Sequence, residues 1–136
     1  MNYELAKKAK ELGYTTCVLV SSAGANSTSM FPYFKMKGEL EDKLKTLEFE
    51  NLVILRPGAL LGPRLKDHNG LGSNIVPFFF GLVYGTWFSK LLGHPVYGDS
   101  VGKAGVQVAI KLESNNEKKG VTIISSKEII ELTTEK

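Results

Sequence analysis

Tyr33 and Lys37 are the residues in this sequence whose types and spacing could perform chemistry together. Four positions separate them, so a helix would project both side chains from one face, about one turn apart. A lysine ammonium beside a tyrosine phenol favours the phenolate form, which helps the phenol to exchange protons near neutral pH. A hydroxyl from Ser22, or from its neighbour Ser21, could orient a substrate oxygen. Together these residues predict a site for proton transfer.

The Tyr-x-x-x-Lys spacing alone is weak evidence. The same spacing recurs at Tyr3 and Lys7, which we interpret as a solvated helix face. The context of Tyr33 and Lys37 is more specific. An apolar segment that ends in two serines precedes the pair, and another that stops at Pro57 follows it.

Hydrophobic periodicity predicts the elements that must position this pair. A helix is expected from Asn2 to Leu12, a buried strand over Thr15–Val20, and a second helix that begins near Pro32. A second strand is expected over Asn51–Leu55. Strand, helix and strand then form one right-handed crossover unit with parallel strands.

The second helix has an inner and an outer face. The inner face is marked by Met36, Leu40, Leu44 and Leu47. On the outer face, Glu39 is expected to pair with Lys43, and Glu41 with Lys45. Gly38 either allows another segment to pack closely on the helix or is merely tolerated there.

Four further segments complete the pattern. We expect a partial helix over Ser73–Trp87, a helix over Ser100–Leu112, a strand over Val121–Ile124 and a short helix over Lys127–Leu132. Helices that alternate with apolar strands are typical of an α/β fold with a doubly wound parallel sheet. None of the 14 glycines forms a phosphate-binding turn after a strand, so the pattern matches the C-terminal part of such a Rossmann-like domain. The sequence predicts one domain, over residues 1–136.

The composition argues against several classes of function. The 17 basic and 14 acidic residues leave a net charge of only +3, and the lysines form no stripe, so nucleic-acid binding is not expected. The single cysteine, Cys17, is interpreted as a small buried hydrophobic residue. No signal or transit peptide is expected. The apolar stretch Ile75–Leu92 is too interrupted to span a membrane, and we favour a buried helix and loop over contact with a membrane surface.

Several segments resemble the short-chain dehydrogenase/reductases, and more closely the atypical members of that family. They are Val20–Ala25, Tyr33–Glu39 and Leu55–Gly62, while Tyr97–Lys103 and Ile124–Ile129 resemble a fungal mitochondrial group within it. The resemblance covers nearly the whole chain but only the later part of the family's fold. It implies a partial NAD(P)-binding domain that lacks the N-terminal, glycine-rich βαβ half.

The resemblance also implies catalytic roles. Tyr33 would be the catalytic acid and base, and Lys37 would also hydrogen-bond the nicotinamide ribose. Ser22 would polarise the substrate carbonyl, with Ser21 as the alternative position.

The implied cofactor is NADP or NAD, bound by Tyr33, Lys37, Pro57 and Gly58. For Pro57 and Gly58, a turn that only ends a strand is nearly as good an interpretation as contact with the cofactor. No metal is expected, because neither histidine has an acidic partner at ligand spacing. Other residues are weaker candidates for a functional role, and we interpret them as loop or core residues. They are Arg64, His68, Phe78, Phe79, Phe80, Trp87 and His94.

Three functions stay open. The first is an NAD(P)-dependent oxidoreductase, in which Tyr33 moves the proton while hydride passes between nicotinamide and a carbonyl or alcohol carbon. The second is a non-catalytic nucleotide-binding or regulatory protein associated with mitochondria, and the third is a truncated fragment without activity. The isolated 136 residues are expected to be inactive and to bind NADPH negligibly.

The expected partners follow from the same reasoning. The substrate would be a small molecule that the sequence does not identify. The resemblance implies peripheral association with the mitochondrial outer membrane, and a cytoplasmic location is the alternative. A homo-oligomer is a further option, because an incomplete sheet would leave an apolar edge that another chain could cover.

Overall fold

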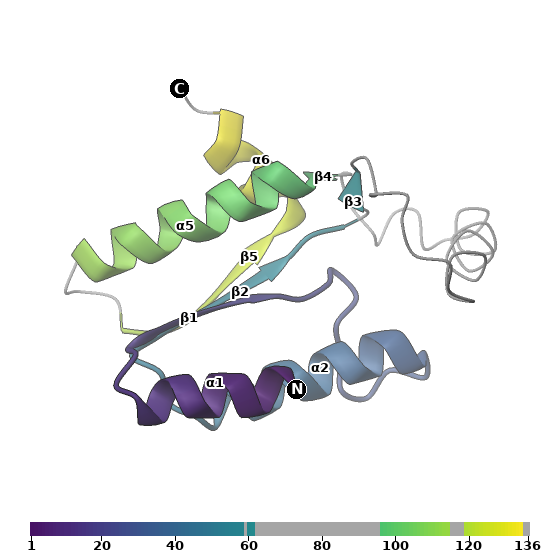
Figure 1. Ribbon diagram of the computed structural model, residues 1–136. Helices are drawn as coiled ribbons and strands as arrows, with labels where there is room; N and C mark the ends of the chain where they lie inside the picture. Colours follow the sequence, from purple (N-terminus) through teal and green to yellow (C-terminus); the bar gives the residue numbers. More distant parts are fainter. Residues whose placement is uncertain (59, 62–95, 115–118, 135–136) are drawn as a thin grey trace, which may run out of the picture.

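The computed structural model describes residues 1–58, 60–61, 96–114 and 119–134. Its helices and strands, in chain order, are α1 (Asn2–Glu11), β1 (Thr16–Val20), α2 (Pro32–Lys45), β2 (Asn51–Arg56), β3 (Leu60–Leu61), β4 (Val96–Tyr97), α5 (Gly98–Ser114), β5 (Gly120–Ser125) and α6 (Ser126–Thr134). The strands β1, β2 and β5 form a parallel sheet in that order. The sheet lies between α1 and α2 on one face and α5 and α6 on the other (Figure 1). This arrangement confirms the expected α/β class and is consistent with part of a Rossmann-like domain.

The central strand, β2, is buried on both faces, as its run of apolar residues requires. Successive side chains of a strand point to opposite faces of the sheet. Leu52 and Ile54 therefore pack in one cluster with Leu44 of α2, whereas Val53 packs in another cluster with residues of α5. The register places Val18 of β1 opposite Val53, so Val18 lies on the α5 face.

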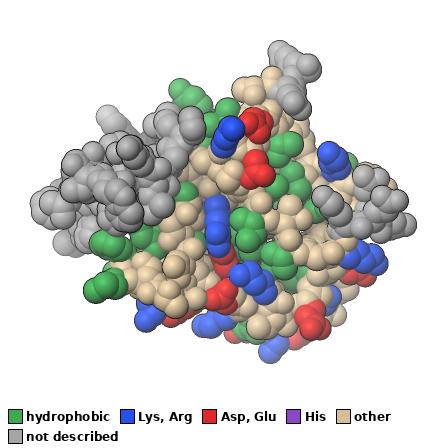
Figure 2. Space-filling model, turned by 180° about the vertical axis from the view of Figure 1, so that it is seen from behind, with side chains coloured by type: hydrophobic (Ala, Val, Ile, Leu, Met, Phe, Trp, Pro, Cys, Tyr) green, Lys and Arg blue, Asp and Glu red, His purple; other side chains and the backbone are tan. Residues whose placement is uncertain are grey.

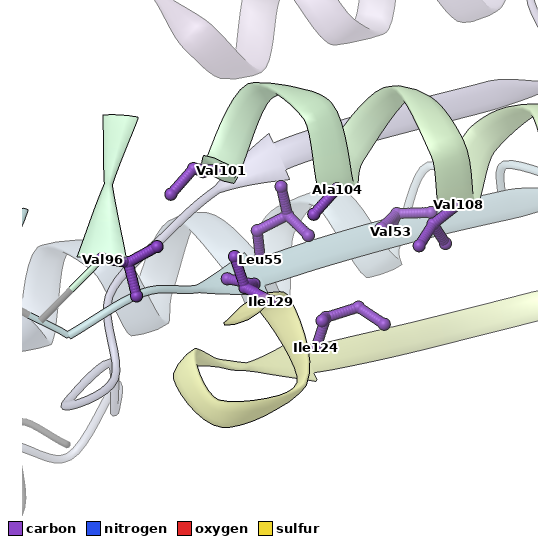
Figure 3. Packing of buried hydrophobic residues seen from close by; sticks show 8 residues of the cluster. All are labelled: Val53, Leu55, Val96, Val101, Ala104, Val108, Ile124 and Ile129. Atoms are coloured by element: carbon purple, nitrogen blue, oxygen red, sulfur yellow. The ribbon is translucent and has the colours of Figure 1, made fainter. Parts of the chain in front are cut away.

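The larger core lies between the sheet and the helices α5 and α6 (Figure 3). Val101, Ala104 and Val108 of α5 are buried there at helical spacing, and Leu112 packs against the same cluster and is partly buried. A fully buried aliphatic side chain stabilises the fold by about 1.5–3 kcal/mol. The whole cluster consists of Val53, Leu55, Val96, Val101, Ala104, Val108, Ile124 and Ile129.

The second core contains the only cysteine of the sequence. Cys17 is partly buried against this cluster, and burial raises the pKa of its thiol, which agrees with the expected role of a small hydrophobic residue. Tyr3 also packs against the cluster, so its assignment to a solvated helix face is wrong, although Lys7 is exposed.

The structure adds two strands that the sequence did not predict. β3 and β4 pair in parallel, with Leu60 opposite Val96, and each has only two residues, too few for a periodic pattern. α5 begins at Gly98, ahead of the expected Ser100. The expected partial helix over Ser73–Trp87 lies outside the described residues.

The last helix begins with a capping box. The Ser125 amide donates to Glu128 Oε2 at 2.7 Å, and the Glu128 amide lies 3.4 Å from Ser125 Oγ, so each residue satisfies a backbone donor of the other. The Ser125 hydroxyl and amide lower the pKa of the Glu128 carboxyl. Because that pKa is lowered in the folded state, the contact stabilises the protein at neutral pH, and the stabilisation is lost as the pH falls through the lowered pKa.

Gly38 lets the loop that follows β1 lie directly on α2. A Cβ at Gly38 would come within 2.1 Å of the Ser27 amide nitrogen and 2.3 Å of the Asn26 carbonyl carbon. Backbone atoms cannot yield as a flexible side chain can. The glycine is therefore required by close packing, which decides between the two interpretations of its role.

We predict that Gly38→Ala lowers the free energy of unfolding by about 2 kcal/mol, because overpacking outweighs the better helix propensity of alanine. Urea unfolding followed by circular dichroism measures the change. Gly98→Ala is the matched control, since a Cβ at Gly98 meets nothing within 4 Å. Its effect should stay within about 0.5 kcal/mol. Equal effects of the two substitutions would contradict the close-packing role of Gly38.

Candidate functional site

The first turn of α2 is held by the loop before it. Phe31 is extended (φ −88°, ψ 119°), and Pro32 occupies the first helical position, where its missing N–H is tolerated. No side chain caps this helix start. Instead, the Asn26 amide donates to the Phe34 carbonyl oxygen at 3.0 Å, and Gly24 lies so close to the Phe34 ring that a Cβ would come within 2.7 Å of it. These contacts fix the turn that carries the predicted acid and base.

Tyr33 and Lys37 lie together at the carboxyl end of β1. Lys37 Nζ is 5.9 Å from the centroid of the Tyr33 ring, within the range of a cation–π interaction. The same Nζ donates a hydrogen bond of 3.4 Å to the carbonyl oxygen of Val20, the last residue of β1. The Tyr33 side chain is 55% exposed, so a ligand can reach it from solvent. The structure therefore brings the two residues to one face and to the strand end, as their spacing predicts.

The two serines that follow β1 are both buried. The Ser21 amide donates to the Leu55 carbonyl oxygen at 2.7 Å and so continues the pairing of β1 with β2. Strand alternation then places the Ser21 side chain on the same face as Leu19, which packs with α2, and places Ser22 on the α5 face. Among the described residues, the Ser21 hydroxyl is a buried polar group without a hydrogen-bond partner. Such a group costs about 1–3 kcal/mol, and a hydrogen bond to a ligand would offset that cost.

Pro57 and Gly58 join the ends of the three parallel strands. Pro57 is fully buried, and its carbonyl oxygen accepts a hydrogen bond of 2.9 Å from the Ala23 amide. The Gly58 amide donates to the Ser126 hydroxyl at 3.0 Å, directly after β5. These contacts support the interpretation of a turn that ends a strand. Contact of the two residues with a nicotinamide stays a prediction.

An ion pair that the sequence did not predict lies next to this site. Glu41, one turn beyond Lys37, is 1% exposed, and its Oε1 and Oε2 accept from Arg56 Nε at 3.0 Å and Nη2 at 2.5 Å. The expected pairing of Glu41 with Lys45 is wrong, because Glu41 faces the sheet and Lys45 instead binds the exposed Asp42 at 3.0 Å. The signal that could have revealed the pair is the four-residue step from Lys37, which puts the carboxylate on the site's own helix face.

The weaker candidates fall outside the described residues. They are Arg64, His68, Phe78, Phe79, Phe80, Trp87 and His94. In the part of the chain that the structure describes, no three His, Cys, Asp or Glu side chains gather in a way that could hold a metal ion.

The donors at this edge fit one end of a nicotinamide cofactor. A ribose and a carboxamide are neutral hydrogen-bonding groups, and the Lys37 ammonium and the buried Ser21 hydroxyl offer matching chemistry. The cofactor's diphosphate is different, because it needs successive backbone amides in a glycine-rich turn between a strand and a helix. No such turn occurs in residues 1–58, 96–114 or 119–134.

Known proteins resemble this chain over nearly all of its length. The model of the family described as HIM1 matches residues 1–75. The protein "FMP52, mitochondrial" of Eremothecium gossypii is 48% identical over 132 residues, which are 97% of this chain. Proteins of the same name from Kluyveromyces lactis and Saccharomyces cerevisiae are 47% and 46% identical over 100% and 98% of the chain. The chain spans 57–59% of the length of these three relatives.

We predict that Glu41→Gln lowers the free energy of unfolding by about 2 kcal/mol. Breaking a fully buried ion pair costs about 3–5 kcal/mol. The loss of stability is smaller here because the Arg56 side chain is 29% exposed. Urea unfolding again measures the change. Glu11→Gln is the control, since Glu11 pairs with Lys8 in an exposed contact that is worth less than about 0.5 kcal/mol. A Glu41→Gln protein as stable as the control would contradict a structural role for the pair.

Proposed function

Since this chain belongs to the HIM1 family, we propose that it is a mitochondrial nucleotide-binding protein whose site lies at the carboxyl edge of the parallel sheet. The observation that carries the proposal is the meeting of Lys37 with the end of β1, one residue before the buried, unpartnered Ser21 hydroxyl. Ligands of open α/β sheets bind beyond the carboxyl ends of the strands. The mitochondrial part rests on the names of the relatives, which describe them as mitochondrial.

The nucleotide is NADP or NAD in this proposal. Lys37 holds the ribose by a charge-assisted hydrogen bond, and the adjacent Tyr33 ring covers one side of the site. The Ser21 hydroxyl offers a hydrogen bond to the ligand, in preference to Ser22, because Ser21 is placed on the α2 face. Pro57 and Gly58 form the base of the site, because their hydrogen bonds join the strand ends. The diphosphate would be held by residues of the longer relatives that this chain does not span.

An oxidoreductase is the second candidate, and the exposed Tyr33 beside Lys37 is the observation that favours it. Bound NADP or NAD would supply or accept the hydride. Tyr33 would transfer a proton to or from the oxygen of a carbonyl or alcohol substrate through its phenolic hydroxyl. Lys37 would stabilise the phenolate by its positive charge, and the serine hydroxyl would orient the substrate oxygen.

The test uses a chimera in which this chain replaces the 132 matched residues of the Eremothecium gossypii protein. We predict that the chimera binds NADPH or NADH at micromolar concentration in calorimetry, and that the 136-residue chain alone does not. Lys37→Met should weaken binding about tenfold, because it removes a hydrogen bond from a charged group. Lys7→Met is the matched control at the other Tyr-x-x-x-Lys position and should change nothing. A chimera that binds neither nucleotide would contradict the proposal.

The same chimera separates the two candidates. If the protein is an oxidoreductase, Tyr33→Phe should lower NADPH oxidation with aldehydes and ketones at least about 100-fold, while NADPH affinity stays the same. If it only binds nucleotides, the chimera should show affinity but no turnover. Tyr3→Phe is the control, because Tyr3 lies on α1, packs against the second core and belongs to the other Tyr-x-x-x-Lys spacing.

Peripheral association with the mitochondrial outer membrane is part of the proposal. No helix in the described part of the chain is long and apolar enough to cross a membrane. The start of α2, however, exposes a patch of apolar side chains beside the exposed Lys35. Met30 is 96% exposed, Phe31 is 47% exposed and Met36 is 53% exposed, so the expectation that Met36 lies on the inner face of α2 is wrong. Exposed apolar side chains bordered by a lysine are typical of a surface that inserts into the interface of an anionic membrane.

We predict that the chain sediments with vesicles that contain an anionic phospholipid and less with vesicles of phosphatidylcholine alone. Met30→Asp should reduce the bound fraction several-fold, because it places a charge in the patch. Leu5→Asp serves as the control, since Leu5 is 71% exposed on α1, outside the patch. Equal loss with both variants would contradict a specific role for the start of α2.

A further inference from the structure

The pair of Glu41 and Arg56 differs in burial from the other ion pairs of the described residues. Lysine or arginine side chains lie beside acidic ones across the face that Figure 2 shows, and exposed pairs of this kind add little stability. The Glu41 carboxylate is instead 1% exposed, and both of its oxygens accept from Arg56, from Nε at 3.0 Å and from Nη2 at 2.5 Å. A guanidinium bound in this way fixes the direction as well as the distance of its partner.

Stability alone does not explain why charged residues occupy these two positions. Leu44, about one turn after Glu41, packs in the second core with apolar residues of β2, the strand that ends at Arg56. Apolar side chains of similar volume often replace a buried ion pair without loss of stability, because charges are costly to remove from water. A bidentate pair adds a single defined geometry between the two elements that carry it.

Two side chains of α2 connect that helix to the ends of two paired strands. Lys37 and Glu41 are four residues apart, so they share one helix face. Lys37 Nζ donates to the carbonyl oxygen of Val20, the last residue of β1, and Glu41 binds the last residue of β2. Val20 pairs with Leu55, which directly precedes Arg56, so the two attachment points are adjacent in the sheet. A shift of α2 that breaks the ion pair therefore also moves Lys37 away from β1.

The hydrogen bond of Lys37 is too weak to determine the position of α2 by itself. Its length of 3.4 Å exceeds the usual range of about 2.7–3.2 Å, and a lysine ammonium is a point charge on a flexible stem. Other contacts must therefore hold the backbone that carries Lys37. Gly38 supplies one through the close packing of the loop after β1, and Glu41 supplies another through the end of β2.

We propose that Glu41 is a positioning residue of the nucleotide site and acts through Lys37. By binding Arg56, Glu41 holds the start of α2 where the Lys37 ammonium reaches both the Val20 carbonyl oxygen and the ribose of a bound nucleotide. Glu41 itself touches no ligand, because its carboxylate is buried and both oxygens bind Arg56. Since the ribose contact belongs to the nucleotide site proposed above, this role of Glu41 rests on that proposal.

The first experiment follows Lys37 in the full 136-residue chain without any nucleotide. Acetic anhydride acetylates lysine amines, and mass spectrometry of the resulting peptides gives the reaction rate at each lysine. Lys37 is half-buried, and it should react several-fold faster in Glu41→Gln than in the wild type, because its side chain is released from the strand end. Lys7 is exposed on α1 and should keep its rate as the internal reference.

Leu44→Ala is the matched control for lost stability. Leu44 is 2% exposed on the same helix, so its truncation should destabilise the chain at least as much as Glu41→Gln does. It leaves the ion pair intact, and Lys37 should therefore react at the wild-type rate. Equal rates at Lys37 in the wild type and in Glu41→Gln, or an equal rise in Leu44→Ala, would overturn the positioning role.

Arg56→Lys is a milder second variant. It keeps the positive charge against Glu41 but loses the planar fork, so Lys37 should react at an intermediate rate. Circular dichroism verifies that each variant is folded, and Arg56→Lys provides the comparison if Glu41→Gln does not fold. A wild-type rate at Lys37 in Arg56→Lys would contradict the need for a bidentate pair.

A double-mutant cycle in the chimera described above tests the link to the nucleotide. Glu41→Gln should weaken NADPH or NADH binding about threefold to tenfold, no more than the loss of the Lys37 hydrogen bond itself. In the Lys37→Met background it should change the affinity less than about twofold, because the lysine that it positions is gone. Unchanged affinity in Glu41→Gln, or equal losses in both backgrounds, would overturn the proposal.

The two experiments separate failure of this proposal from failure of the nucleotide site. A chimera that binds neither nucleotide would refute the site itself, and the role of Glu41 in nucleotide binding with it. The acetylation rates would still decide whether Glu41 positions Lys37. A chimera that loses affinity with Lys37→Met but not with Glu41→Gln would instead keep the site and refute only the role of Glu41.

Discussion

Everything in this structure depends on the parallel pairing of β1, β2 and β5 about a central strand that is buried on both faces. Parallel strands share one carboxyl edge, so segments far apart in the sequence must end at the same place. Ser21 follows β1, Pro57 follows β2 and Ser126 follows β5. Backbone hydrogen bonds join the ends of β1 and β2, and a hydrogen bond from the Gly58 amide to the Ser126 hydroxyl joins the ends of β2 and β5. The chain thereby builds one edge where a ligand can meet groups from all three strands.

The position of α2 against that edge is set by two contacts of different kinds. Gly38 removes the side chain that would keep the loop after β1 away from the helix. Glu41 binds the Arg56 guanidinium at the end of β2 through both carboxylate oxygens. Lys37 directly precedes Gly38 and lies one turn before Glu41 on the same helix, so the close packing and the ion pair together set its distance from Val20. These two contacts hold α2 against the sheet, although its first turn has no side-chain cap.

Sequence patterns predicted the parts of the fold that depend on local order. β1 and α5 were predicted because apolar residues recur at the spacing of a strand or a helix within a short window. β3 and β4 were missed because two-residue strands exist only through a pairing between Leu60 and Val96, which no local pattern contains. Glu41 was assigned to the surface because the local i,i+4 rule offered Lys45, while its actual partner, Arg56, is brought close only by folding.

The candidate site could also be predicted only where it depends on local sequence order. The shared face of Tyr33 and Lys37 follows from helix geometry alone. The choice between Ser21 and Ser22 does not follow from helix geometry. It depends on the register of β1, which decides which of the two buried hydroxyls faces α2. The roles of Ser22, Pro57 and Gly58 toward a cofactor rest on the family resemblance and stay predictions. The carboxyl end of β1 matters most for the proposed nucleotide site, because the Lys37 ammonium binds the Val20 carbonyl oxygen there.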